Sequence, residues 1–270
     1  MSASVASHRA TAPARRFTTS QWRTLFTPPL SGSENMALDD ALMERARRTG
    51  EPVFRVYGWV RPTLSLGRNQ AARGRYDPDR IRAAGVDVVR RPTGGRAILH
   101  HHEVTYSVTA PVDGMGTLAE SYHRINRLLL EGLARLGVSA SEAVAVGRTP
   151  LPGVTPCFQA PVAGEIVASG RKLVGSAQFR ERGALLQHGS ILIHDDQSLA
   201  SSLLVHPLPP PPPPATLAEL LGAPPLPDDV AHALFSVLND VQPLTRDDEL
   251  ERDTISRRPV YEDPGWTWRR

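Results

Sequence analysis

The chain has 270 residues, 40% of them hydrophobic, which is enough to bury a full core, most simply as one catalytic domain of about 200 residues with an appendage. Its net charge of +3 comes from scattered residues without a long basic run, which excludes nucleic acid as an expected partner. No apolar run reaches the roughly 18 residues of a membrane span and the N-terminus lacks the apolar core of a signal peptide, so we expect a soluble, cytoplasmic protein without a membrane partner.

The first predicted segment is a disordered N-terminal extension over residues 1–30. Residues 1–33 contain no acidic residue and are rich in serine, threonine, alanine and arginine. An organelle transit segment has the same composition and stays as the alternative.

The first predicted helix covers residues 33–49. Ser31 and Glu34 have the spacing of a capping box, and Gly50 is a typical stop. Two short runs of branched and aromatic residues follow at 52–59 and 63–67, bounded by proline and glycine, and both predict strands.

The middle of the chain predicts three more strands and a helix. Residues 86–91 and 96–100 flank Pro92-Thr93-Gly94-Gly95, which predicts a strand–turn–strand hairpin, and 103–110 continues as strand. A second capping box, at Thr117 and Glu120, begins a helix over 117–136, and one of its faces is marked by Leu118, Tyr122, Ile125, Leu129, Leu133 and Leu136.

Residues 147–164 hold four prolines and three glycines without apolar periodicity, which predicts a loop that carries Cys157. Residues 165–168 and 171–179 then predict a hairpin with its turn at Ser169-Gly170, and 184–193 a further strand.

A proline tract at 207–214 predicts an extended linker, with a polyproline recognition ligand as the alternative. Helices predicted at 216–222, 228–240 and 245–258 form a small helical appendage over 215–270. The catalytic domain is therefore predicted at 31–206, in an α/β (α+β) fold with mixed or antiparallel sheets flanked by helices.

The distribution of basic residues singles out one position. The chain has thirty arginines and one lysine, Lys172, and its one cysteine, Cys157, lies 15 positions upstream. An ammonium enters a tight pocket that a planar guanidinium does not, and a nearby cation favours the reactive thiolate. Lys172 and Cys157 are therefore candidate site residues, although a free cysteine is often only a small buried hydrophobe.

Other motifs predict less chemistry. The glycines of RRPTGGR (90–96) allow close approach to a ligand, but neither a Walker motif nor G-x-G-x-x-G occurs. In the His100-His101-His102 triplet, strand alternation would put His101 on the opposite face from the other two, so we expect no metal site. His188 is expected to pack or to hydrogen-bond.

Five blocks taken together resemble the lipoate/biotin protein ligase superfamily. They are ENMALDDALM (34–43), RVYGWVRPTLSLGRNQ (55–70), RRPTGGRAILHHHEVTYSV (90–108), PCFQAP (156–161) and GRKLVGSAQFRERGALLQHGSILI (170–193). Within the superfamily the chain most resembles the cysteine-dependent octanoyltransferases of the Gram-positive type, over about residues 33–205.

The resemblance implies a fold like the catalytic domain of biotin and lipoate protein ligases, with a mixed sheet enclosing an acyl tunnel. It implies transfer of octanoyl from acyl carrier protein to a lysine of a lipoyl domain, carried by the glycine cleavage H protein or a 2-oxoacid dehydrogenase E2. It implies no cofactor.

The resemblance also implies residue roles. Cys157 matches the acyl-accepting nucleophile and Lys172 the lysine that contacts the acyl carbonyl. The implied substrate-binding residues are Arg91, Thr93, Gly94, Gly95, His100, Gly175, Ser176, Ala177 and His188. His101 departs from the pattern, since relatives commonly place aspartate there.

Two other functions stay open. An ATP-dependent lipoate ligase of the same fold would form an acyl-adenylate and would need no thiol, so Cys157 argues against it. A non-catalytic module that binds carrier proteins would use the cysteine only for packing.

Overall fold

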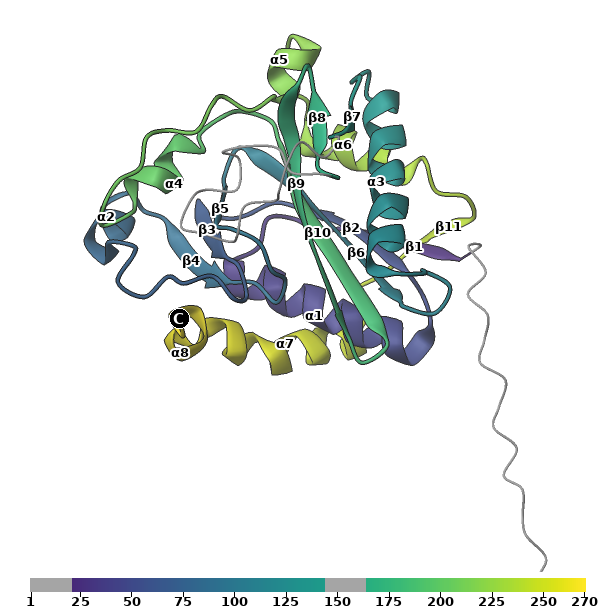
Figure 1. Ribbon diagram of the computed structural model, residues 1–270. Helices are drawn as coiled ribbons and strands as arrows, with labels where there is room; N and C mark the ends of the chain where they lie inside the picture. Colours follow the sequence, from purple (N-terminus) through teal and green to yellow (C-terminus); the bar gives the residue numbers. More distant parts are fainter. Residues whose placement is uncertain (1–20, 144–163) are drawn as a thin grey trace, which may run out of the picture.

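The computed structural model describes residues 21–143 and 164–270 (Figure 1). Cys157 and most of its predicted loop lie outside the described residues. The helices are α1 (Gly32–Thr49), α2 (Pro78–Ala83), α3 (Leu118–Arg135), α4 (Ser198–Ser202), α5 (Leu217–Leu221), α6 (Pro227–Phe235), α7 (Asp248–Glu262) and α8 (Pro264–Thr267). Within these ranges, none of the helices has the length and apolarity needed to cross a membrane.

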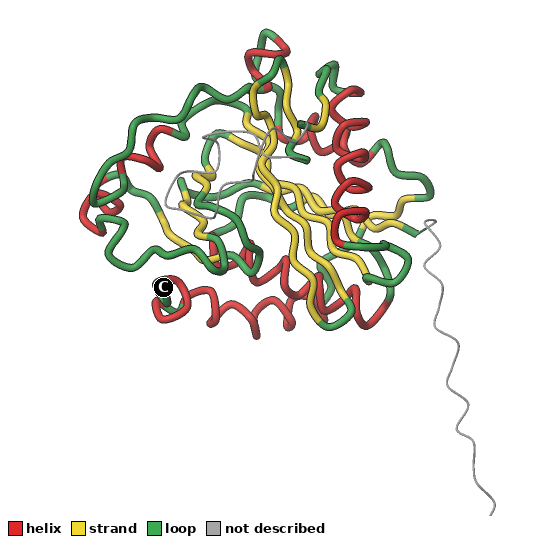
Figure 2. The backbone as a smooth tube through the Cα atoms, viewed as in Figure 1, coloured by secondary structure: helices red, strands yellow, loops and turns green. Residues whose placement is uncertain are grey.

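A large mixed sheet forms the centre of the molecule (Figure 2). Its strands are β1 (Trp22–Phe26), β2 (Val53–Tyr57), β6 (Glu103–Pro111), β7 (Ser141–Glu142), β8 (Ile166–Ala168), β9 (Arg171–Glu181), β10 (Ala184–Leu192) and β11 (Val241–Pro243). Their order is β11-β1-β2-β6-β10-β9-β8-β7, with parallel pairing of β1 to β11 and β2, and antiparallel pairing elsewhere. The predicted α/β architecture is confirmed.

A second sheet holds β3 (Thr63–Leu66), β4 (Asp87–Arg90) and β5 (Ile98–His100) in the order β4-β3-β5. The predicted hairpin between the strands near 86–91 and 96–100 is therefore wrong. β3 lies between them, parallel to β4 and antiparallel to β5, so Pro92–Gly95 crosses over β3 instead of turning tightly. The strands themselves lie where they were predicted.

Helices cover the two faces of the large sheet. Leu38 and Leu42 of α1 pack with Leu25 of β1 and with Leu250 of α7 on one face. Apolar residues of α3 and α6 pack on the other face, in the largest core cluster. Both predicted capping boxes are present, at Ser31 before α1 and at Thr117 before α3, so both helices begin where the sequence predicts.

Both ends of the described chain depart from the sequence prediction. Residues 22–26 form β1 inside the large sheet, so the predicted disordered extension is wrong for this part. After the proline tract, β11 pairs with β1, and α7 lies along α1 (Figure 1). The segment 215–270 is thus not purely helical, and it packs on the body. The division into domain, linker and appendage otherwise stays a prediction.

Candidate functional site

A pocket lies where the small sheet meets the large one. Its empty volume, open mouth included, is about 410 Å³, within the range of small-molecule sites. The lining residues are Met36, Tyr57, Trp59, Ser65, Arg91, Gly95, Ile98, His100, Thr105, Gly175, Ser176, Ala177, His188, Gly189 and Ser190. Apolar and aromatic side chains share this wall with a few buried polar groups, as in sites that bind a largely apolar ligand.

Most of the predicted substrate-binding residues come together here. Arg91, Gly95, His100, Gly175, Ser176, Ala177 and His188 all line the pocket. Thr93 is fully buried behind the wall, where its hydroxyl lies 2.6 Å from His188 Nε2. The Gly94 carbonyl accepts a hydrogen bond from Arg91.

Arg91 holds the glycine loop in place. Its Nη2 donates to the carbonyls of Gly94 (2.8 Å) and Arg96 (2.7 Å), and its Nη1 donates to the carbonyl of Ser65 on β3 (2.9 Å). Gly95 has a φ of 92°, a conformation that side chains rarely adopt. The predicted close approach of this loop to a ligand therefore has a rigid support.

His188 is a buried, hydrogen-bonded histidine, as predicted. Its Nδ1 lies 3.2 Å from Asp39 Oδ2, and its Nε2 faces Thr93. Burial lowers the pKa of His188 despite the neighbouring Asp39 carboxylate. A neutral imidazole between a carboxylate and a hydroxyl has a fixed orientation, so His188 presents a constant surface to the pocket.

Asp39 belongs to a network that the sequence analysis missed. Its carboxylate accepts from Arg55 Nη1 and Ser107 Oγ at Oδ1, both at 2.8 Å, and from Tyr57 at Oδ2 at 2.9 Å. Burial would raise the pKa of Asp39, but Arg55, His188 and Ser107 together lower it. The signal in the sequence was Asp39 itself, a charged residue among the apolar core positions of the predicted 33–49 helix, because a buried charge needs a buried partner.

His100 is another buried residue of the pocket lining. Its Nε2 lies 2.8 Å from Ser65 Oγ, its ring stacks on Trp59 at 4.1 Å between centroids, and its Nδ1 faces Glu103 at 3.4 Å. Burial lowers the pKa of His100, although Glu103 opposes the shift. Both stacked rings belong to the pocket lining, so an indole and a buried imidazole share this part of the wall.

Lys172 lies on β9, the strand that also carries Gly175, Ser176 and Ala177. It is 2% exposed, and its Nζ lies 2.6 Å from Oε1 of Glu165, which is 5% exposed. The β8–β9 hairpin, confirmed with its turn at Ser169-Gly170, pairs Lys172 with Val167, and Glu165 directly precedes β8. The sequence analysis did not predict Glu165 as a partner of Lys172.

The pocket wall also depends on a glycine that the sequence analysis passed over. A Cβ on Gly189 of β10 would lie 2.5 Å from the Gly175 carbonyl oxygen and 2.8 Å from the Tyr106 ring. Strands β9, β10 and β6 therefore approach more closely here than any side chain would allow.

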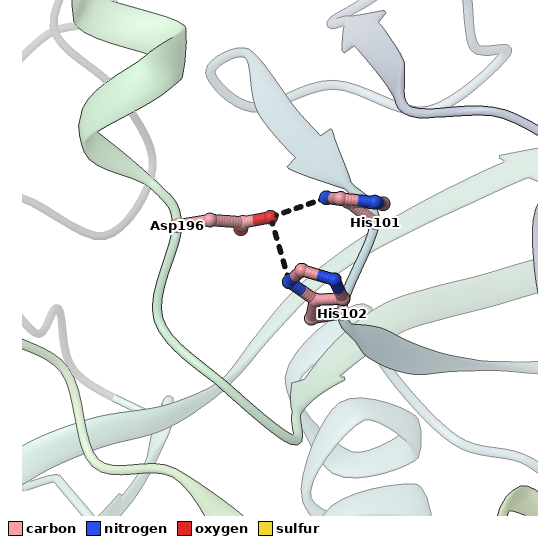
Figure 3. A group of neighbouring side chains, drawn as sticks. All are labelled: His101, His102 and Asp196. Atoms are coloured by element: carbon pink, nitrogen blue, oxygen red, sulfur yellow. Dashed lines mark hydrogen bonds and ion pairs between the residues drawn. The ribbon is translucent and has the colours of Figure 1, made fainter.

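The histidine triplet differs from its prediction. His100 ends β5 and is buried, while His101 and His102 form a bend and are both exposed, facing Asp196 (Figure 3). The predicted placement of His101 opposite the other two is wrong, because strand alternation ends at His100.

Comparison with known proteins identifies the family to which this fold and pocket belong. Residues 31–239 match the lipoyl protein ligase A/B catalytic domain. The octanoyltransferase LipM of Carboxydothermus hydrogenoformans is 45% identical over 179 residues, 65% of this chain and 66% of that protein. LipM of Kyrpidia tusciae is 42% identical over 230 residues, 79% of this chain and 84% of that protein.

Solved structures share the fold. Lipoate-protein ligase A bound with ATP has a TM-score of 0.74 at 23% identity, covering 92% of this chain and 98% of that one. A bipartite lipoate protein ligase from Thermoplasma acidophilum has a TM-score of 0.70 at 20% identity, covering 92% and 96%. At these identities the likeness supports the fold alone.

The fold, the pocket and the matched domain define the chain as a member of the lipoyl protein ligase A/B catalytic-domain family. Its relatives are enzymes, which argues against a module that only binds carrier proteins. Within the family the chain belongs with the LipM octanoyltransferases, and it is an acyltransferase.

Proposed function

We propose that this chain transfers an octanoyl group from octanoyl-acyl carrier protein to a lysine of a lipoyl domain, through a thioester on Cys157. The observation that carries the proposal is the buried Lys172–Glu165 ion pair, in which Lys172 belongs to β9, the strand that also contributes Gly175, Ser176 and Ala177 to the pocket. A lysine so thoroughly buried is rare in proteins unless it is paired or serves a site.

The chain connectivity is compatible with a Cys157–Lys172 pair. The ends of the segment that carries Cys157 meet, because Gly164 N donates to the Ala143 carbonyl at 3.0 Å and Ala143 N to the Glu165 carbonyl at 2.7 Å. Six residues lie between Cys157 and Gly164, so the connecting chain spans at most about 25 Å when extended. A Cys157–Lys172 pair is therefore within reach of the chain, since Gly164 directly precedes Glu165, the partner of Lys172.

The proposed reaction has two steps. The Cys157 thiolate attacks the thioester carbonyl, the bond to the carrier's sulfur breaks, and the carrier leaves as a thiolate that takes up a proton. The amine of the target lysine then attacks the acyl-enzyme, an amide forms, Cys157 leaves as thiolate and the amine loses a proton to solvent. One thioester replaces another in the first step, so ATP is not required.

Lys172 has a defined task in this scheme. Its ammonium favours the thiolate and donates to the oxyanion that develops in both steps. Glu165 orients the ammonium and offsets the cost of burying its charge. The octanoyl tail occupies the pocket between the Trp59–His100 stack and the glycine-lined strands.

Intact-mass spectrometry tests the proposal. The purified chain is incubated with octanoyl-acyl carrier protein without ATP, and a lipoyl domain is then added. We expect one octanoyl group on the wild-type chain, its transfer to the domain, and loss of both signals in Cys157→Ser. Arg171→Lys, which keeps the charge of the half-buried neighbour of Lys172, is the control that should react normally.

The other outcomes overturn the proposal. Octanoylation or lipoylation of the domain by Cys157→Ser that requires ATP would identify a ligase using an acyl-adenylate. Absence of an acyl adduct and of any turnover by the wild-type chain would identify a module that only binds carrier proteins.

A further inference from the structure

Two histidines and one aspartate meet on the surface beside the turn from β5 to β6. His101 Nδ1 lies 2.8 Å from Asp196 Oδ2, and His102 Nδ1 lies 3.4 Å from the same oxygen (Figure 3). One potential ligand atom from each residue lies within 4.8 Å of the other two, and no second group of three or more such side chains occurs in residues 21–143 and 164–270.

The backbone fixes both sides of this cluster. The His102 carbonyl accepts from the amides of Ile193 (2.9 Å) and His194 (3.0 Å), which ties the bend to the end of β10. Gln197, 1% exposed, donates from Nε2 to the Leu99 carbonyl at 2.9 Å. The backbone on both sides of Asp196 is therefore anchored, at His194 and at Gln197, and so is the bend that carries the two histidines.

The two imidazoles face one carboxylate oxygen, and His101 is hydrogen-bonded to it. Their rings stack at 3.7 Å between centroids, and both direct Nδ1 to a single carboxylate oxygen. A surface histidine needs only one such partner, as His123 shows with Glu142 at 2.7 Å. Two imidazole nitrogens and a carboxylate oxygen that face one another are the donor atoms a metal site uses, and binding of a cation releases the protons that such ligands carry.

We propose that His101, His102 and Asp196 bind a divalent transition-metal ion of the zinc class. In a tetrahedral zinc site, bonds of about 2.0–2.1 Å put ligand atoms about 3.3 Å apart. The observed separations between histidine nitrogen and Asp196 oxygen, 2.8 Å and 3.4 Å, lie on either side of this value, and the ligand atoms of the two histidines lie within 4.8 Å of each other. Two imidazoles and one carboxylate suit zinc better than magnesium or calcium, which prefer oxygen ligands.

The fourth position would fall to water or to His194, whose ring centroid lies 5.9 Å from that of His102. Bound metal would join the β5–β6 bend to the segment after β10. Because His100 of the pocket wall directly precedes the bend, the ion would stiffen one wall of the acyl site.

Zinc titration of the metal-free full chain tests this proposal, with the Cys157→Ser background used so that the thiol does not contribute. We expect one Zn²⁺ per chain and a higher melting temperature with Zn²⁺. His101→Ala and Asp196→Asn should weaken binding by at least about tenfold, the lower bound for losing even an outer-shell partner. His123→Ala, which removes an exposed histidine from a two-residue pair, should bind like the parent.

Co²⁺ supplies a second readout, since visible bands of four- or five-coordinate cobalt should appear in the parent and vanish in Asp196→Asn. Circular dichroism without metal should be the same for all variants, because the altered side chains are exposed or half-buried. Equal Zn²⁺ affinity in parent and Asp196→Asn would overturn the proposal, as would absence of Zn²⁺ binding in the Cys157→Ser background. Neither result depends on octanoyl transfer.

Discussion

Asp39→Asn should strongly destabilise the fold, although aspartate and asparagine have nearly the same shape. Asp39 and Arg55 are both fully buried, and their side chains pair at 2.8 Å. Removing one partner from such a pair leaves a buried, uncompensated charge, which typically costs about 3–5 kcal/mol. Against a total stability of about 5–15 kcal/mol, this is a large share.

The hydrogen bonds point to the upper part of that range. Four donors converge on the two carboxylate oxygens, Arg55 and Ser107 on one and Tyr57 and His188 on the other. An asparagine amide would place an NH₂ group against one of these pairs. The hydroxyls of Ser107 and Tyr57 can rotate to accept, but the Arg55 guanidinium has no lone pair to offer.

Urea denaturation at pH 7.5 measures the effect, with Asp39→Leu/Arg55→Met as the comparison. The double variant removes both charges, and such replacements are often close to neutral. We therefore expect it to recover much of the stability lost in Asp39→Asn. A cost below about 1 kcal/mol for Asp39→Asn, or a double variant no more stable than the single one, would refute this account of the network.

The pH dependence gives an independent check on the same residue. The folded-state pKa of Asp39 is lowered, so its contribution is present above the unfolded value of 3.8 and is lost as pH falls through the folded value. The stability difference between wild type and Asp39→Asn should therefore be constant near neutral pH and shrink in acid. A stability difference that grows as pH falls would mean that the pKa of Asp39 is raised on folding and not lowered.

Three further predictions concern the pocket. Lys172→Arg should fold yet lose about 10²- to 10³-fold in turnover, because the wider guanidinium is misaligned for the oxyanion. Turnover equal to that of the wild type would remove this lysine from the mechanism. Gly189→Ala should lower the free energy of unfolding by about 1–3 kcal/mol through overpacking against β9, measured by urea denaturation, and an unchanged midpoint would contradict the close approach. The pKa of His188 is lowered in the folded chain, so the unfolded chain takes up the proton at a higher pH and stability should fall as pH drops through 6.5. The melting temperature of His188→Asn should depend less steeply on pH in this range than that of the wild type.

The sequence was informative where the determining interactions are local. The capping boxes at Ser31 and Thr117 involve residues three positions apart, and both helices begin at the predicted place. The β8–β9 hairpin likewise turns at Ser169-Gly170, where backbone conformation favours such residues. Local chemistry was sufficient in each case.

Pairing between distant strands was not predictable in the same way. β1 pairs with β11, so that Trp22 lies beside Val241, and nothing near either residue signals the other. The predicted hairpin in the small sheet was wrong for the same reason. The two glycines at 94–95 would fit a tight turn equally well, and only the position of β3 between β4 and β5 excludes a hairpin of these two strands. Register between non-adjacent strands depends on the whole core.

The pocket was predicted in part. The glycine loop and the β9 segment were found through short motifs, whereas Trp59 and Ser65 were missed. Both lie in or beside strands whose composition fits an ordinary core, and a pattern of apolar residues does not tell a face that packs from a face that encloses a ligand. The His101–His102 bend shows the converse error, in which a regular alternation was extended past the end of a strand.

A comparison of two buried cations, Arg55 and Lys172, gives a physical reason for one lysine in a chain of arginines. Every nitrogen of the Arg55 guanidinium donates, reaching Thr27, Asn35 and Asp39, which is the use of a planar fork. Lys172 instead places a compact charge 2.6 Å from one carboxylate oxygen of Glu165. An ammonium can take this position on a narrower stem than a planar guanidinium requires. The rarity of lysine in the composition thus has a physical counterpart at this position: it remains where a point charge fits and a fork does not.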